Sequence, residues 1–203
     1  MPLIKYNNQS LSAITAIPAS IPTGKLKLIS SQTASNSASI SFTSGLNSTY
    51  KVYKFVFVNI HPTINSHFVF NLSTDGGSNY NVTKTTTSFG SGHKEDDTET
   101  LFSYDTGSDL AQSTSDQRIS SQGGINTGND ESLSGSLTLF NPASTTYVKH
   151  FISNTQHYHG STWSINSFMA GYGNTTSAVN AIRFQMSSGN FDGTIYLYAI
   201  DNS

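Results

Sequence analysis

The chain has 203 residues, a formal net charge of −2 and only 11% charged residues, against about 25% in an average soluble domain. Ser, Thr, Asn and Gly supply 92 of the 203 residues, which excludes an all-α protein, and 10 Tyr with 12 Phe exclude a disordered chain. The absence of cysteine excludes disulfides and thiolate chemistry, the charge balance predicts no nucleic-acid partner, and no apolar run is long enough for membrane insertion.

Residues 1–24 differ in pattern from the rest of the chain. Apolar residues recur every three or four positions at Leu11, Ile14 and Ile17, but Pro18 limits any helix because the residue before proline avoids the α region. A piece this small cannot fold alone. We therefore predict an extended N-terminal arm, 1–24, that lies on the domain or docks on a neighbouring chain. It lacks the layout of a signal peptide.

From residue 25 the apolar pattern changes to period two, which is typical of half-buried strands. Strands are predicted over 25–29, 38–43, 50–60, 67–72 and 80–87. The segment 50–60 is nearly continuous in its apolar character, so we expect a central strand covered on both faces. Residues Asp75-Gly76-Gly77-Ser78 predict a turn, because glycine permits positive φ.

Residues 88–131 form a predicted loop-rich stretch that holds nine of the twelve acidic residues. A short helix over 109–119 is expected there, with Asp109 near its start. Strand patterns return over 133–140, 145–152, 162–170, 178–186 and 193–200. Eight to ten strands joined by turns predict one all-β domain over 25–203, an antiparallel β-sandwich that is jelly-roll-like.

His157-Tyr158-His159 is the sharpest site-like feature. Residues i and i+2 of a strand share a face, so the two imidazoles could bind one metal, and three copies on a trimer axis could supply six nitrogens. The alternative, which we favour, is two exposed loop histidines beside Gly160. We therefore predict no metal and no cofactor.

Other candidate groups give weaker signals. The carboxylates of 95–99 could bind calcium, but they lack the spacing of a known calcium loop, and a solvated acidic loop is favoured. Tyr104, Tyr158, Trp163 and Tyr172 could stack on sugars, although a core position for Trp163 is favoured. There is no Gly-x-Ser-x-Gly elbow and no phosphate loop, so we predict that the protein is not an enzyme.

Four blocks of residues occur in order along 38–200. They are Tyr50-x-x-Tyr53-Lys54-Phe55 with Asn59-Ile60-His61-Pro62; Asp130 to Gly135 with Leu139-Phe140-Asn141-Pro142 and Tyr147 to Phe151; Ala170-Gly171-Tyr172 with Asn174 to Ala178 and Ile182 to Asn190; and Asp192 to Ile200. Together they resemble a family of structural proteins of marine tailed phages such as cyanophages and pelagiphages. Ala199 stands where that family usually has glycine.

This resemblance implies a non-enzymatic virion component, assembled in the host cytoplasm. We expect a capsid decoration or head-associated protein that forms a homotrimer and binds other virion proteins, with Leu11, Ile14 and Ile17 as candidate partner contacts. The alternative is a tail-fibre or baseplate module that binds host surface polysaccharide or a receptor, with Tyr158 and Trp163 as candidate contacts.

Overall fold

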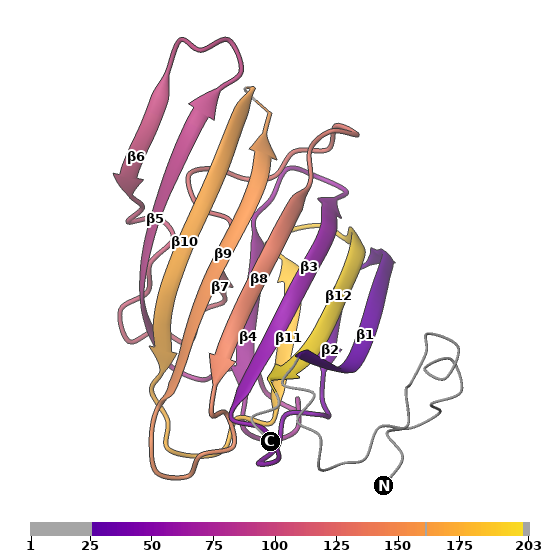
Figure 1. The fold of residues 1–203 in the computed structure, drawn as a ribbon, viewed down its shortest axis with the longest axis vertical. Coiled ribbons are helices and arrows are strands. Elements are labelled where there is room, and N and C mark those ends of the chain that lie inside the picture. Colours follow the sequence, from indigo (N-terminus) through magenta and orange to yellow (C-terminus); the bar gives the residue numbers. More distant parts are fainter. Residues whose placement is uncertain (1–25, 161, 201–203) are drawn as a thin grey trace, which may run out of the picture.

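The computed structural model describes residues 26–160 and 162–200. Within these residues, all strands pair in antiparallel fashion in two sheets, so the predicted all-β antiparallel sandwich is confirmed (Figure 1). The predicted arm, with Leu11, Ile14 and Ile17, lies outside the described residues. The described part contains no helix long and apolar enough to cross a membrane.

The larger sheet has eight strands and the smaller has four. In spatial order the larger sheet contains β1 (Leu26–Ser37), β12 (Phe191–Ile200), β3 (Val52–Pro62), β8 (Leu133–Phe140), β9 (Lys149–His159), β10 (Trp163–Gly173), β5 (Lys84–Lys94) and β6 (Thr100–Tyr104). The smaller sheet contains β2 (Ser39–Phe42), β11 (Ala181–Met186), β4 (Phe68–Ser73) and β7 (Gln117–Arg118). Figure 1 shows the smaller sheet behind the half of the larger one that runs from β8 to β1.

Eight of the strands divide equally between the two sheets, and along the chain they change sheet at every step except from β4 to β7. Their spatial orders are β1-β12-β3-β8 in the larger sheet and β2-β11-β4-β7 in the smaller sheet, and we call these eight strands the sandwich core. The remaining strands, β9, β10, β5 and β6, continue the larger sheet beyond β8. We call these four strands the extension.

The core between the two sheets is aromatic, with Phe184 of β11 at its centre. Ring centroids at 5.1 to 6.3 Å from that of Phe184 come from both sheets: Phe42, Phe68 and Phe70 from the smaller, Phe55 and Phe57 from the larger. These contacts arise because alternate residues of each strand face inward and are fully buried. Apolar burial of this kind is the main source of stability in the sandwich.

The inner face of the extension is covered by segment 105–131, and hydrogen bonds between polar side chains and backbone lie there beside buried apolar residues such as Phe151 and Ile119. Thr86 Oγ1 donates to Gln117 Oε1 (2.7 Å), Gln117 Nε2 donates to the Ser108 carbonyl (2.7 Å), and Thr155 Oγ1 donates to the Ile119 carbonyl (3.1 Å). For each of these buried groups, a hydrogen bond within the protein thus replaces the one that it would form with water. Abundant Ser and Thr can therefore fill this part of the interior.

Three expectations about strands and helices are wrong in detail. No helix forms over 109–119, because the backbone there bonds to β5: Lys84 and Ser113 exchange both N–H···O=C bonds, and Thr86 N donates to the Leu110 carbonyl. The stretch 88–131 is less loop-rich than expected, since β5 continues to Lys94 and β6 follows. Strand β3 is buried on one face only, with Val58 39% exposed. The turn at Gly76 and Gly77 is confirmed, with φ of 74° and 93°.

Candidate functional site

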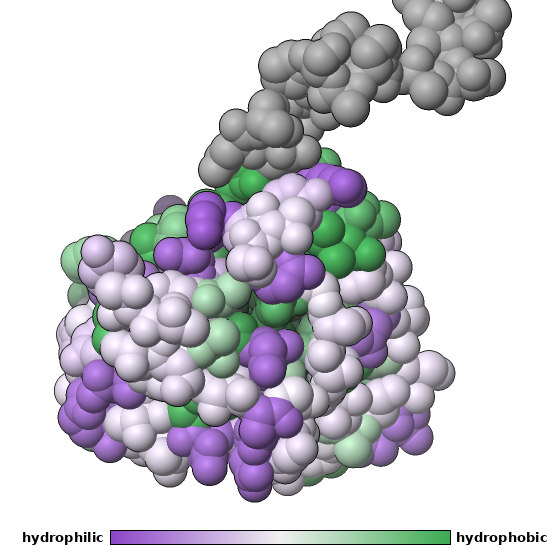
Figure 2. All heavy atoms as spheres, turned by 90° about the horizontal axis from the view of Figure 1, so that it is seen from below, coloured by the Kyte–Doolittle hydropathy of each residue, from purple (hydrophilic) through white to green (hydrophobic). Residues whose placement is uncertain are grey.

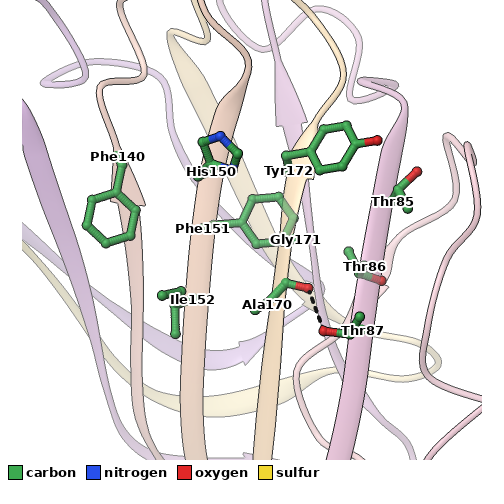
Figure 3. A pocket seen from close by; sticks show the side chains of 10 residues that line it. All are labelled: Thr85, Thr86, Thr87, Phe140, His150, Phe151, Ile152, Ala170, Gly171 and Tyr172. Atoms are coloured by element: carbon green, nitrogen blue, oxygen red, sulfur yellow. Dashed lines mark hydrogen bonds between the residues drawn. The ribbon is translucent and has the colours of Figure 1, made fainter.

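The outer face of the larger sheet, which points away from the smaller sheet, contains a hollow of about 460 Å³ over β8, β9, β10 and β5. Figure 3 shows the ten lining residues: Thr85, Thr86, Thr87, Phe140, His150, Phe151, Ile152, Ala170, Gly171 and Tyr172. The hollow thus takes residues from four strands that lie side by side.

The strand register explains the hollow. Ala170 on β10 pairs with Ile152 on β9 and with Thr87 on β5, so a single methyl group stands between two larger side chains. Two residues further along β10, Tyr172 lies between His150 of β9 and Thr85 of β5. The ring centroids of His150 and Tyr172 are 6.1 Å apart. The hollow exists because Ala170 is too small to fill this space, and the rings of His150 and Tyr172 border it.

The chemistry of the hollow is that of a binding surface. Its floor is apolar, and its polar groups are the Tyr172 hydroxyl, the His150 imidazole and threonine hydroxyls, one of which (Thr87) donates to the Ala170 carbonyl at 3.5 Å. No carboxylate lies among the lining residues. Apolar surface with a few polar groups is typical of ligand or partner binding.

His157 and His159 lie on the inner face of β9, as the i, i+2 spacing predicts, but His157 is fully buried. Neither ring nitrogen of His157 has a hydrogen-bond partner. Burial above all, together with the nearby His159 and His67, lowers the pKa of His157 to about 4. The imidazole is therefore neutral at pH 7.

This burial changes both interpretations of the histidine pair. The exposed-loop interpretation is wrong for His157, which lies inside a strand with 0% exposure. Sharing a metal between copies on a trimer axis needs imidazoles at the surface, so His157 does not fit that arrangement either. Among the described residues no group of three or more His, Asp or Glu side chains is placed to hold a metal ion.

Tyr158 and Trp163 point to opposite faces of the larger sheet. Tyr158 lies on the outer face, where its hydroxyl donates to Glu95 Oε2 at 3.3 Å. Trp163 lies on the inner face, where its ring stands over Gly92, 3.1 Å from the position that a Cβ there would take. The two rings therefore do not form one sugar-stacking platform, and of the other aromatic candidates only Tyr172 borders the hollow.

The carboxylates of the acidic loop 95–99 form hydrogen bonds and ion pairs with residues of the loop and of the end of β5 just before it. Thr98 donates to Asp96 through its backbone N–H (3.0 Å) and its hydroxyl (2.5 Å), which lowers the pKa of Asp96. Lys94 Nζ lies 3.3 Å from Glu99 Oε1, and His93 Nε2 lies 2.9 Å from Asp97 Oδ1. The side chains of the loop are exposed, in agreement with a solvated acidic loop.

The hollow and its lining were not predicted from the sequence. Ile152 and Phe168 carry the one available signal, because they stand at positions of predicted strands that alternate with buried residues, yet are 54% and 38% exposed. Periodicity shows that two faces exist, but it does not show that one of them remains uncovered.

Comparisons of the chain with protein-family models, with curated proteins and with solved structures gave no match. The likeness to phage structural proteins therefore rests on the four blocks of residues quoted above.

Proposed function

We propose that this chain is a non-enzymatic structural component of a tailed-phage virion, namely a capsid decoration or head-associated protein. The observation that carries the proposal is the strand order of the core, β1-β12-β3-β8 over β2-β11-β4-β7. Two nested Greek keys, which make a jelly roll, produce these strand orders. Jelly rolls build many viral capsid domains, and the sequence resemblance points to the same class. Since fold alone does not define function, both are needed.

The positions of the resembling blocks support this proposal. The first block covers β3, the second covers β8 and the start of β9, the third covers the end of β10 and all of β11, and the last covers β12. The resemblance therefore extends over strands of both sheets. It concerns the architecture of the sandwich rather than one loop.

The proposal includes self-association and attachment to other virion proteins. A homotrimer is the expected form, and incorporation into the particle in the host cytoplasm is the expected assembly route. Sparse charge suits this role, because like-charge repulsion between adjacent identical copies is costly. Figure 2 shows the molecule from below, and this end is mostly pale, with both strongly hydrophilic and hydrophobic residues scattered among weakly polar ones.

Quantitative mass spectrometry of purified particles tests the proposal. A decoration protein is expected in hundreds of copies on the head, whereas about six to eighteen copies at the tail would indicate a fibre or baseplate component. Absence of the protein from purified particles would overturn the proposal.

A second candidate function is a tail-fibre or baseplate-associated module that binds host glycan or a receptor. The hollow favours it, because Tyr172 and His150 border an open apolar floor on which a sugar ring could stack. A glycan array with purified protein tests this candidate. The expected result is binding that is lost in Tyr172→Ala and kept in Tyr147→Ala, which changes an exposed tyrosine that is not among the lining residues. Absence of saccharide binding by the wild type would remove this candidate.

A further inference from the structure

The outer face of five neighbouring strands carries no full charge. Outward side chains come from even-numbered positions of β6, β8, β9 and β10 and from odd-numbered positions of β5, and none of these is Asp, Glu, Lys or Arg. Lysines do occur in these strands, but Lys84 and Lys149 point inward and are fully buried. Lys84 Nζ donates to Asn71 Oδ1 (2.6 Å) and to the Val82 carbonyl (2.8 Å). The strands thus hold cations inside and leave the outer face neutral.

Three phenylalanines form a cluster on this neutral face. The rings of Phe89 and Phe168 are stacked, with centroids 5.1 Å apart and planes 11° from parallel, and Phe102 packs against Phe89 at 5.9 Å. Phe102 is 79% exposed, Phe168 is 38% exposed and Phe89 is 37% exposed. The rings order one another, yet much of their surface faces solvent.

The cluster is continuous with the hollow. Phe168 pairs with Phe89, and two positions further along β10 Ala170 pairs with Ile152 of β9, which is 54% exposed. Apolar surface therefore extends from β6 across β5, β10 and β9 to the edge of β8. We call the surface formed by Phe89, Phe102, Phe168, Ile152, Phe140 and Tyr172 the phenylalanine face.

A face of this kind is unusual for a sheet that meets only water. The exposed side of an antiparallel sheet normally carries polar and charged residues, and contiguous exposed apolar surface marks an interaction site. The centre of a protein interface is poor in charge and rich in aromatic residues, and its rim is polar. Acidic groups lie at the margin here: Glu95 accepts from Tyr158 and Asp109 accepts from Tyr104.

The extent of the face fits a protein partner. Five strands at about 4.8 Å spacing and four outward positions at about 6.8 Å spacing cover on the order of 650 Å² before side-chain relief is added. A stable interface of standard size buries about 800 Å² on each partner. The exposed phenylalanines also lack the hydroxyl groups with which a sugar-binding platform would be expected to bond.

We propose that the phenylalanine face is the surface through which copies of this chain associate, each copy burying this face against another. A face without net charge has no like-charge repulsion against its own copy, which makes a second copy the partner that its chemistry favours. The proposal rests on the self-association included in the proposed function, but it depends neither on the trimer as the particular oligomer nor on where in a particle the protein lies.

Analytical ultracentrifugation of the full chain tests the proposal. The doubly substituted protein Phe102→Ser, Phe168→Ser is expected to self-associate at least tenfold more weakly than the wild type. The matched control is Tyr147→Ser, which removes an aromatic ring that is 70% exposed outside this face and is expected to leave association unchanged. Circular dichroism checks that each variant remains folded.

A cross-linking experiment gives a second, independent measurement. Because the chain has no cysteine, Asn154→Cys places a single thiol on the face, beside Phe168. Mild oxidation is expected to yield disulfide-linked copies at concentrations where Ser177→Cys, on an exposed loop, remains unlinked. This measurement does not require the removal of any apolar residue.

Two outcomes would overturn the proposal, and they differ in what else they affect. A wild-type chain that stays monomeric up to about 100 μM would reject both the face and the self-association in the proposed function. An oligomeric wild type that is unchanged by the double substitution would reject the face alone. Neither outcome bears on the presence of the protein in purified particles.

Discussion

Phe184 is the residue on which the two sheets converge. Its ring touches rings from β2, β4 and β3, and it is fully buried. Such a residue contributes apolar burial and many dispersion contacts at once, and its neighbours can collapse only partly into the space that it would leave.

Phe184→Ala is therefore expected to lower the free energy of unfolding by about 3–5 kcal/mol. Tyr147→Ala, which truncates a ring that is 70% exposed, is expected to lower it by less than about 0.5 kcal/mol. Urea denaturation of both variants measures the two values. Similar values for both would contradict the central position of Phe184.

His157 makes the stability of the fold depend on pH. Its pKa is lowered to about 4 by burial, whereas an unfolded histidine titrates near 6.5. Between these values the unfolded chain binds a proton that the folded chain does not bind. The free energy of unfolding therefore falls as pH drops from about 6.5 to about 4, and this contribution levels off below that range.

His157→Leu is expected to remove this dependence, which amounts to about 3 kcal/mol over the whole interval. The wild type and the variant should differ in stability more at pH 4.5 than at pH 7.5. Above pH 7 the variant should be at least as stable as the wild type, because both ring nitrogens of His157 lack partners. Chemical denaturation at a series of pH values measures this, and parallel curves for the two proteins would contradict it.

At the scale of single elements, β8 joins the sandwich core to the extension. It pairs with β3 on one side and with β9 on the other, and Gly135 lies between Phe57 and Thr155. A Cβ at Gly135 would stand 2.4 Å from the Asn154 carbonyl oxygen and 2.6 Å from the Thr155 Cα. Both are backbone atoms, so the strand requires glycine at this point.

Gly135→Ala is expected to cost about 1–3 kcal/mol of stability through overpacking against β9. Ser136→Ala, at the next position on the outward side, provides the matched control and should change stability by less than about 0.5 kcal/mol. Thermal unfolding of the two variants gives the comparison. An unchanged stability of the Gly135→Ala variant would contradict this and would mean that β9 can shift to make room for the methyl group without loss of stability.

At the scale of the whole molecule, the sandwich has two kinds of interior. Between the two sheets the interior is aromatic, whereas under the extension buried Ser, Thr and Gln side chains lie beside apolar residues such as Ile165 and Met169. Among the described residues, the apolar core takes residues from both sheets, from Ala34 of β1 to Ala199 of β12.

Deletion of residues 1–22 is expected to leave a folded sandwich with a near-native unfolding transition, while incorporation into particles or trimers becomes weaker. Circular dichroism checks the fold, and a competition between full-length and shortened protein for assembly checks the arm. Equal incorporation at equal concentration would reject a docking role for 1–24.

Much of the strand content was predictable because alternation is a local property. The segment 133–140 was expected and is found as Leu133–Phe140, while 193–200 lies within Phe191–Ile200. The end of β5 was missed because Gly90, Gly92 and Lys94 give no apolar alternation. The helix over 109–119 was wrong because its backbone groups bond to β5, a partner distant in sequence.

The candidate site could not be predicted in the same way. A strand period of two predicts that His157 and His159 lie on the same face of β9. It does not predict that His157 is fully buried, because burial depends on which segments pack against β9. The same reasoning applies to Tyr158 and Trp163, which belong to different strands and whose opposite orientations follow from how β9 and β10 pair.

The sequence by itself determined an antiparallel sandwich with few charges, because strand periodicity and composition are properties of short segments and of the chain as a whole. Only the tertiary structure decided that β5 pairs with β10 and β6 with β5. This pairing brings Phe89 and Phe102 to the side of Phe168, from positions more than 60 residues earlier. Strand pairing over such separations is set by the packing of the entire sheet. The same pairing places uncharged side chains, among them three phenylalanines, together on one face of the larger sheet.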